Sequence, residues 1–531
     1  MKIVFYSSNS NIFDKENFFI TTLPSHFQKW KEFIKNHPED EFYFVTEQPG
    51  MFILDSFYLG FITNPKNGRV KGLKVVSLDR TYLGFNTNPK NGRVKALSKA
   101  CLDRTYFDED EVCKNNLSVE NLLKENNIYV LEENSCDLDI FAQKIMNFNP
   151  DFAISMSFWV NPFDWLPVQD SLIAEKLESN GINVISHPAE LNYNFFDKNK
   201  TKQILEKNGF LTPKGIYVNH DMYFCAGNRK EIKKNVYKDY ILNQIKKLNF
   251  PLIAKDPFGL SSYGMQVLNT YGEVCNYLNS KKNNSDRIIE EMISGNQFGI
   301  EFLCCNAISN TKTISNEKSI SIFPPFMFSV NKYGITSPKQ SIKIGPIKEN
   351  SQKNDFCVKE LYDLIKKLAQ TFDFNGIAQV DLVLHEKQWY IIEINPRLSG
   401  MTLSSLSFFN DFNNSIFEVF YNHFVLKNQT VNESINKISN SEAIKCINLK
   451  LPLLSKDDLL KLKNLSFVKY VCQTENKSAL QEREKGFCEV IICGESACEL
   501  QSYIVKIEKD FSTEAEKSLF INAKEMLLLC F

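Results

Sequence analysis

Residues Gly376–Thr402 read GIAQVDLVLHEKQWYIIEINPRLSGMT, and this stretch decides how the fold is interpreted. The alternation of apolar and polar residues predicts two strands with a tight turn between them. Side chains in a strand alternate between faces, so Glu393 and Asn395 point the same way, and an antiparallel partner can bring Asp381 beside them. Two carboxylates and an amide oxygen are ligands that Mg²⁺ prefers. The stretch therefore predicts a metal site, although a solvated amphipathic hairpin has the same pattern.

The predicted metal site constrains the turn between the two strands. In an uninterrupted antiparallel ladder, Asp381 and Glu393 face each other only across a turn of odd length, such as Glu386–Lys387–Gln388. A regular two-residue turn without a bulge would place the two acids on opposite faces of the hairpin. The register of the hairpin is therefore a direct test of the metal site.

The residues that follow add an anion-binding group to the predicted metal site. Arg397 lies two residues after Asn395 and can hold a phosphate or a carboxylate through two hydrogen bonds. The whole segment resembles the C-terminal signature of the ATP-grasp superfamily, in which acids, a metal ion and an arginine act on phosphoryl groups. The resemblance implies ATP and one or two Mg²⁺ ions as cofactors, with Mn²⁺ as a substitute, and a role for Arg397 in catalysis.

Further ATP-grasp landmarks occur upstream in the family's order. The resemblance implies that Lys198, at the start of a helix, and Lys255, on a strand, approach the nucleotide's phosphates. It also implies a phosphate-binding lid over about 255–268, because small residues let the backbone approach phosphates closely. The expected nucleotide-binding residues of this lid are Gly259, Ser261, Ser262 and Gly264.

The segment RIIEEMISGNQFGIEFL resembles the family's adenine-binding hinge. The resemblance assigns Glu290 to the adenine amino group and places Met292 and Ile293 in the hinge. A ribose-binding acid usually follows, but this sequence has Gln297 at that place. Glu301 is a second candidate acid for the ribose.

Length and composition restrict the classes of protein that fit the sequence. A chain of 531 residues predicts about two to four domains. The net charge of −1 gives no electrostatic indication of nucleic-acid binding. No apolar run approaches the roughly 18 residues that a membrane-spanning helix needs, and the N-terminal residues do not resemble a signal peptide. The 14 scattered cysteines favour reduced residues of a cytoplasmic protein.

We expect an α/β and α+β multidomain fold. Residues 1–190 alternate strand and helix patterns and predict a parallel sheet, here an N-terminal α/β pre-ATP-grasp domain. Within it, residues 59–82 are repeated almost identically at 83–106, and this tandem duplication is interpreted as an insertion without a catalytic role, with a substrate loop or an oligomer contact as the alternative. Residues 191–430 are expected to form a two-part ATP-grasp domain, and residues 431–531 a small C-terminal α+β domain.

The resemblance, which is to the amino-acid ligase and biotin-carboxylase-like branches, implies an ADP-forming ligase that activates a carboxylate as an acyl phosphate for attack by an amine. The expected substrates are amino acids or a related small acid and amine. The expected partners are ATP and small-molecule acid and amine substrates, with a homodimer left open and neither nucleic acid nor membrane. Two alternatives remain: a carboxylase or carbamoyl-phosphate-type enzyme that uses bicarbonate, and a non-catalytic ATP-binding regulatory protein. A small basic pocket would favour bicarbonate, and a larger mixed cavity beside Arg397 would favour an amino-acid ligase.

Overall fold

The computed structural model describes most of the chain outside the N-terminal duplication. The described residues are 1–8, 18–23, 26–46, 124–131, 137–156, 166–225, 234–258, 265–305, 318–330, 341–348, 355–441, 445–476, 485–511 and 517–531. The duplication at 59–106 and the predicted phosphate-binding residues Gly259, Ser261, Ser262 and Gly264 lie outside these ranges.

A parallel sheet of five strands forms the N-terminal part of the fold, as the alternating pattern predicts. Its strand order is β4-β3-β1-β5-β6, and every neighbouring pair is parallel. Helix α1 (His26–Asn36) packs against one face, and α6 (Leu138–Met146) and α7 (Leu166–Glu178) pack against the other. The strands are β1 (Lys2–Ser7), β3 (Glu41–Thr46), β4 (Ile128–Val130), β5 (Phe152–Ser155) and β6 (Asn183–Ile185).

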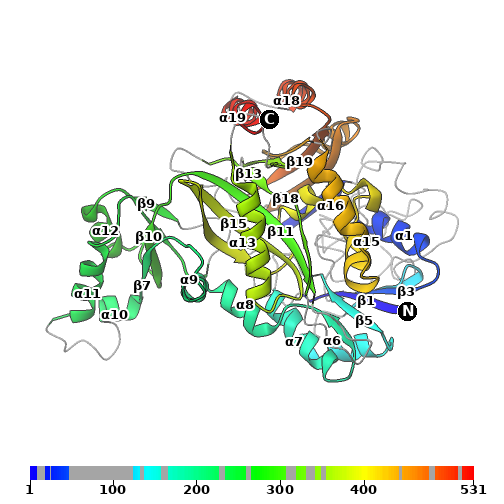
Figure 1. Ribbon diagram of the computed structural model, residues 1–531, viewed down its shortest axis with the longest axis horizontal. Coiled ribbons are helices and arrows are strands. Elements are labelled where there is room, and N and C mark those ends of the chain that lie inside the picture. Colours follow the sequence, from blue (N-terminus) through cyan, green and yellow to red (C-terminus); the bar gives the residue numbers. More distant parts are fainter. Residues whose placement is uncertain are drawn as a thin grey trace, which may run out of the picture.

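A small antiparallel lobe stands at one end of the molecule (Figure 1). Its strands follow the order β7-β10-β8-β9. Within the described part of this lobe, apolar side chains of α10, α11 and α12 pack with one face of the sheet. Lys255 and Glu290 lie on the opposite face. The elements are β7 (Gly215–Val218), α10 (His220–Phe224), α11 (Val236–Ile245), β8 (Leu252–Lys255), β9 (Gln266–Leu268), α12 (Tyr271–Leu278) and β10 (Arg287–Glu291).

A ten-stranded antiparallel sheet forms the body of the protein. The strand order is β16-β15-β11-β13-β14-β17-β19-β18-β2, and β12 pairs with β11 outside this path. The strands are β2 (Phe18–Leu23), β11 (Asn296–Cys305), β12 (Ser319–Ile322), β13 (Phe326–Phe328), β14 (Ile342–Gly345), β15 (Gly376–His385), β16 (Gln388–Asn395), β17 (Lys445–Leu451), β18 (Val468–Asn476) and β19 (Gly486–Gly494). The C-terminal strands β17–β19 therefore continue the sheet that contains the predicted metal hairpin, and β2 from the N-terminal region completes its far edge.

Apolar helices cover the two faces of this sheet. On one face, α13 (Val358–Thr371), α17 (Lys456–Lys463), α18 (Ala497–Phe511) and α19 (Lys517–Cys530) contribute to one large core. Helix α13 is amphipathic and buries residues at helical spacing such as Leu361, Ile365 and Leu368. On the other face lie α14 (Thr402–Leu406), η3 (Asn410–Phe412), α15 (Ile416–Phe420), η4 (Tyr421–Val425) and α16 (Thr430–Asn440), whose core also includes α1.

Two consecutive helices connect the N-terminal sheet to the small lobe and carry site residues. These are α8 (Ala189–Phe196) and α9 (Lys198–Lys207). The side chain of Asp197 caps α9 by accepting from the backbone N–H groups of Asn199 and Lys200. This cap places Lys198 at the first position of the helix, as predicted. Among the described residues, no helix is both long enough and apolar enough to cross a membrane.

Candidate active site

The β15–β16 hairpin places Asp381 directly opposite Glu393, as the metal site requires. The predicted odd-length turn is wrong: His385 pairs with Gln388, so the turn has two residues. Both turn residues have positive φ, 47° at Glu386 and 62° at Lys387, as in the type I′ turns that suit tight hairpins. A β-bulge compensates for this turn length, and the two acids reach the same face.

The bulge lies immediately beside the two acids. Leu382 pairs with Ile391 whereas Asp381 pairs with Glu393, which leaves Ile392 as the extra residue. Trp389 and Ile391 are buried in the core, and the next buried residue of the strand is Ile394. Glu393 therefore does not share the buried face of Trp389 and Ile391, because the face changes at the bulge.

The two facing carboxylates repel each other when both are ionised. Loss of water around Asp381 and the nearby charge of Glu393 raise the pKa of Asp381 to about 7. A hydrogen bond from Gln379 and the positive charges of Lys343 and Arg397 lower this pKa only in part. A divalent cation between the acids would remove this repulsion. Within the described ranges, no cluster of three or more His, Cys, Asp and Glu side chains could hold a metal ion. A metal here would therefore depend on two carboxylates together with the Asn395 amide.

Gln379 connects two of the predicted metal ligands and was missed in the sequence. Its Nε2 donates to Asp381 Oδ1 at 2.5 Å, and its Oε1 accepts from Asn395 Nδ2 at 2.8 Å. Gln379 also pairs directly with Asn395 across the strands. The sequence signal was its position two residues before Asp381, which puts both side chains on one strand face.

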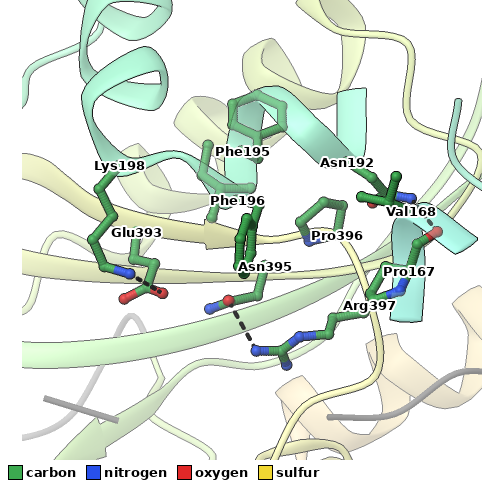
Figure 2. A pocket seen from close by; sticks show the side chains of 11 residues that line it. Pro167, Val168, Asn192, Phe195, Phe196, Lys198, Glu393, Asn395, Pro396 and Arg397 are labelled. Carbon is green, nitrogen blue, oxygen red and sulfur yellow. Dashed lines mark hydrogen bonds and ion pairs between the residues drawn. The ribbon is translucent and has the colours of Figure 1, made fainter. Parts of the chain in front are cut away.

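Two cationic side chains contact the other ligand oxygens (Figure 2). Lys198 Nζ lies 3.3 Å from Glu393 Oε1, and Arg397 Nη2 donates to Asn395 Oδ1 at 3.1 Å. Each predicted metal ligand is thus held by an N–H donor of the protein itself. The structure brings the predicted catalytic arginine, one predicted phosphate-binding lysine and the three predicted metal ligands together.

A pocket lies beside these cationic side chains and reaches helices α7 and α8. Its walls combine charged groups with apolar side chains from α7, α8 and the segment after β16. The lining residues are Pro167, Val168, Asn192, Phe195, Phe196, Lys198, Glu393, Ile394, Asn395, Pro396 and Arg397. The cavity beside Arg397 is therefore mixed rather than uniformly basic.

A second charged cluster lies where the small lobe meets α9. The buried carboxylate of Glu290 lies 2.5 Å from Lys255 Nζ and 3.3 Å from Lys202 Nζ. Burial alone would raise the pKa of Glu290, but the two ammonium groups bring it below its ordinary value. Burial lowers the pKa of Lys202, against the opposing effect of Glu290. Lys202 was missed, although it lies one helical turn after Lys198 and so faces the same side of α9.

The predicted adenine hinge joins the small lobe to the main sheet. The backbone N–H of Met292 donates to Pro251 O at 3.0 Å, and Ile293 is partly exposed. Gln297 lies on β11 opposite Val383. The roles of these residues and of Glu290 in nucleotide binding stay predictions.

Glu301 does not suit the ribose contact for which it was a candidate. Its side chain is fully enclosed, with 0% exposure. Its carboxylate accepts from the hydroxyls of Ser399 at 2.8 Å, Thr402 at 2.6 Å and Ser405 at 2.7 Å. Burial raises its pKa, and these three hydrogen bonds lower it in part. Glu301 instead fixes the segment that follows Arg397.

Comparison with known proteins identifies the domain to which these residues belong. Residues 195–401 match the model of the ATP-grasp domain. A segment of 161 residues, 30% of this chain, is 26% identical to the carbamoyl phosphate synthase large chain of Clostridium perfringens and spans 14% of that protein. A segment of 180 residues, 34% of this chain, is 27% identical to D-alanine–D-alanine ligase of Buchnera aphidicola and spans 54% of that protein.

Solved structures resemble the chain over nearly its whole length. The L-amino acid ligase from Bacillus licheniformis has a TM-score of 0.54 at 14% identity and covers 96% of this chain and 97% of its own. N5-carboxyaminoimidazole ribonucleotide synthetase from Thermus thermophilus has a TM-score of 0.52 at 11% identity and covers 97% of this chain and 99% of its own.

The chain therefore contains an ATP-grasp domain within a mixed α/β ATP-grasp fold. The curated relatives are matched over 14% to 54% of their own lengths, so they indicate the domain and leave the substrates open.

Proposed function

We propose that this protein is an ADP-forming ligase that uses ATP to activate a carboxylate as an acyl phosphate and joins it to an amine. The observation that carries this proposal is the direct pairing of Asp381 with Glu393, because Glu393 lines one pocket together with Asn395 and Arg397. Paired oxygen ligands next to a guanidinium suit the transfer of a phosphoryl group to a bound acid.

The proposed reaction has two steps. A carboxylate oxygen attacks the γ-phosphorus of ATP, the bond between this phosphorus and the bridging oxygen breaks, and ADP leaves. An amine nitrogen then attacks the acyl carbon, the carbon–oxygen bond to phosphate breaks, and the nitrogen gives up a proton to the solvent. The protein contributes mainly positioning and charge neutralisation.

Each charged residue of the site has a role in this proposal. Asp381, Glu393 and Asn395 would hold one or two Mg²⁺ ions, or Mn²⁺, and such an ion, when bound, neutralises charge on the phosphates. Lys198 and Lys255 bind phosphate oxygens once they exchange their present carboxylate partners. The adenine and ribose bind beside Glu290, Met292, Ile293 and Gln297. Arg397 stabilises charge on the transferred phosphoryl group.

We further propose how the chain is organised. Residues 1–190 form the pre-ATP-grasp domain, and residues 191–430 form the two-part ATP-grasp domain with a lid at about 255–268. Residues 431–531 form the C-terminal domain, whose strands β17–β19 share a sheet with the β15–β16 hairpin. The protein acts in the cytoplasm on small molecules, and its net charge of −1 gives no indication of nucleic acid or an anionic membrane as a partner. A homodimer is compatible with this organisation.

A bicarbonate-dependent enzyme is the second candidate, because curated relatives of the domain include a carbamoyl phosphate synthase large chain. The mixed walls of the pocket favour the first candidate: Pro167, Val168 and Phe196 lie in the same cavity as Arg397. The third candidate, a regulatory ATP-binding protein, does not account for the full set of charged residues in the site.

ADP release measures the proposed function directly. The full-length protein is assayed with Mg²⁺ and ATP against a matrix of amino acids and other small acids and amines, with bicarbonate as a separate arm. We expect ADP release that requires both an acid and an amine. Release with bicarbonate alone would support the second candidate, and tight ATP binding without release in any arm would support the third.

A further inference from the structure

Asn192 places a polar side chain in an otherwise apolar corner of the pocket. It lies on α8, is 3% exposed, and lines the cavity together with Pro167, Val168 and Arg397 (Figure 2). Buried asparagines normally satisfy both ends of their amide with hydrogen bonds. The partners of each end therefore indicate what the residue does.

The hydrogen bonds of the Asn192 amide fix its orientation. Its Nδ2 donates to Pro167 O at 3.0 Å and to Ser171 Oγ at 2.6 Å. Ser171 Oγ donates its own hydrogen to Pro167 O at 2.8 Å, so it must accept from Asn192. A flipped amide would set Oδ1 against the Pro167 carbonyl, which has no proton to donate. Asn192 Nδ2 therefore faces α7, and both of its hydrogens are donated to α7.

The other end of the amide is unsatisfied. Asn192 Oδ1 is buried and, across the part of the chain that the structure describes, has no hydrogen-bond partner. Leaving a buried acceptor unpaired costs about 1–3 kcal/mol. An unpaired acceptor in the wall of the candidate active site indicates that a ligand supplies the missing donor.

The surroundings select the chemistry of this donor. Lys198, Glu393 and Arg397 line the same pocket. Glu393 is paired with Lys198, which leaves the positive charge of Arg397 to disfavour an ammonium ion there. An amide carbonyl is neutral, so unlike a carboxylate it supplies no negative charge that would retain the ammonium form. The neutral amine is also the form with a free electron pair for attack, and it still has N–H groups to donate.

We propose that Asn192 is the amine-binding residue of the pocket: its Oδ1 accepts a hydrogen bond from the neutral amine of the second substrate. The inference rests on the proposed ligase function and names the part of the site that receives the nucleophile. The apolar side chains of Pro167, Val168 and Phe196 contact the substituent that carries this amine, which favours a small amine with an apolar side chain, such as an amino acid.

A matched pair of ligands tests this inference. Calorimetry of the full-length protein with Mg²⁺ and ADP, at about pH 9 where an α-amino group is neutral, compares L-alaninamide with propanamide, which lacks only the amine. We expect the wild-type protein to bind L-alaninamide about tenfold more tightly, as expected for one additional hydrogen bond. The Asn192→Leu variant should lose this preference. The Ser171→Ala variant, which loosens the same amide but keeps Oδ1, should retain it.

Equal binding of the two ligands by wild type, or an unchanged preference in Asn192→Leu, would overturn the inference. If Asn192→Leu no longer binds ADP and so fails to fold, Asn192→Ala takes its place and is judged by the same comparison. The ligase proposal is tested separately by ADP release. If the wild-type protein releases no ADP, the ligase proposal fails, whatever the result of the binding comparison.

Discussion

Asp381 and Glu393 face each other across the β15–β16 hairpin although the turn between their strands has two residues. The bulge at Ile392 is the cause, because it shifts the pairing by one residue just before Glu393. Deletion of Ile392 should therefore remove the bulge and leave Asp381 opposite Glu393 in an uninterrupted ladder, because Glu393 then follows Ile391 directly. We expect this variant to keep its Mn²⁺ binding, measured by calorimetry, together with its secondary structure by circular dichroism. Loss of Mn²⁺ binding in a variant that keeps its secondary structure would contradict the register argument.

Glu393→Gln should abolish turnover and leave the fold intact. The substitution removes a charged metal ligand, and metal ions contribute several kcal/mol of charge stabilisation, so we expect ADP release to fall at least about a hundredfold. Glu386→Gln on the exposed turn of the same hairpin is the control and should remain active. Unchanged turnover in Glu393→Gln would remove this residue from the metal site.

The pKa of Asp381, raised to about 7, predicts how stability depends on pH. The folded group holds its proton above the pH at which the unfolded chain releases it, so stability falls as pH rises from about 4 to about 7. Three pKa units set an upper limit of about 4 kcal/mol for this loss. Urea unfolding without metal should show that Asp381→Asn gains stability relative to wild type at pH 7.5 but not at pH 4. An equal difference at both pH values would contradict this prediction.

Glu301 should stabilise the segment after Arg397 through its three hydroxyl partners. Glu301→Ala leaves the hydroxyls of Ser399, Thr402 and Ser405 unsatisfied in a buried site, and we expect a loss of about 3 kcal/mol or more in the free energy of unfolding. Glu301→Gln keeps an acceptor for the Ser399 and Thr402 hydroxyls and should lose clearly less. Denaturant unfolding of both variants measures this, and equal losses would exclude the hydrogen-bond explanation.

Local sequence patterns predicted those parts of the fold that depend on short-range chemistry. The parallel N-terminal strands and the two strands of the β15–β16 hairpin each follow from the pattern of apolar residues. The pairing of β2 with β18 was missed, because it joins residues far apart in the chain and edge pairing leaves little local signal.

The candidate site was also predicted in part. Asp381, Glu393, Asn395, Arg397 and Lys198 lie together, as the resemblance to ATP-grasp proteins implied. The bulge was missed, although adjacent apolar residues before Glu393 are compatible with a change of face. The partners of Glu301 and of Asn192 depend on tertiary contacts that the spacing of residues within one segment does not encode.

One measurement tests the central claim most directly: a crystal structure with Mn²⁺ and a non-hydrolysable ATP analogue, in which the anomalous signal of manganese locates the metal. The account predicts a peak coordinated by carboxylate oxygens of Asp381 and Glu393 and by a phosphate oxygen of the analogue, with Lys198 moved from Glu393 to the phosphates. A bound analogue whose metal lies away from both acids, or acids that still face each other with no metal between them, would contradict it.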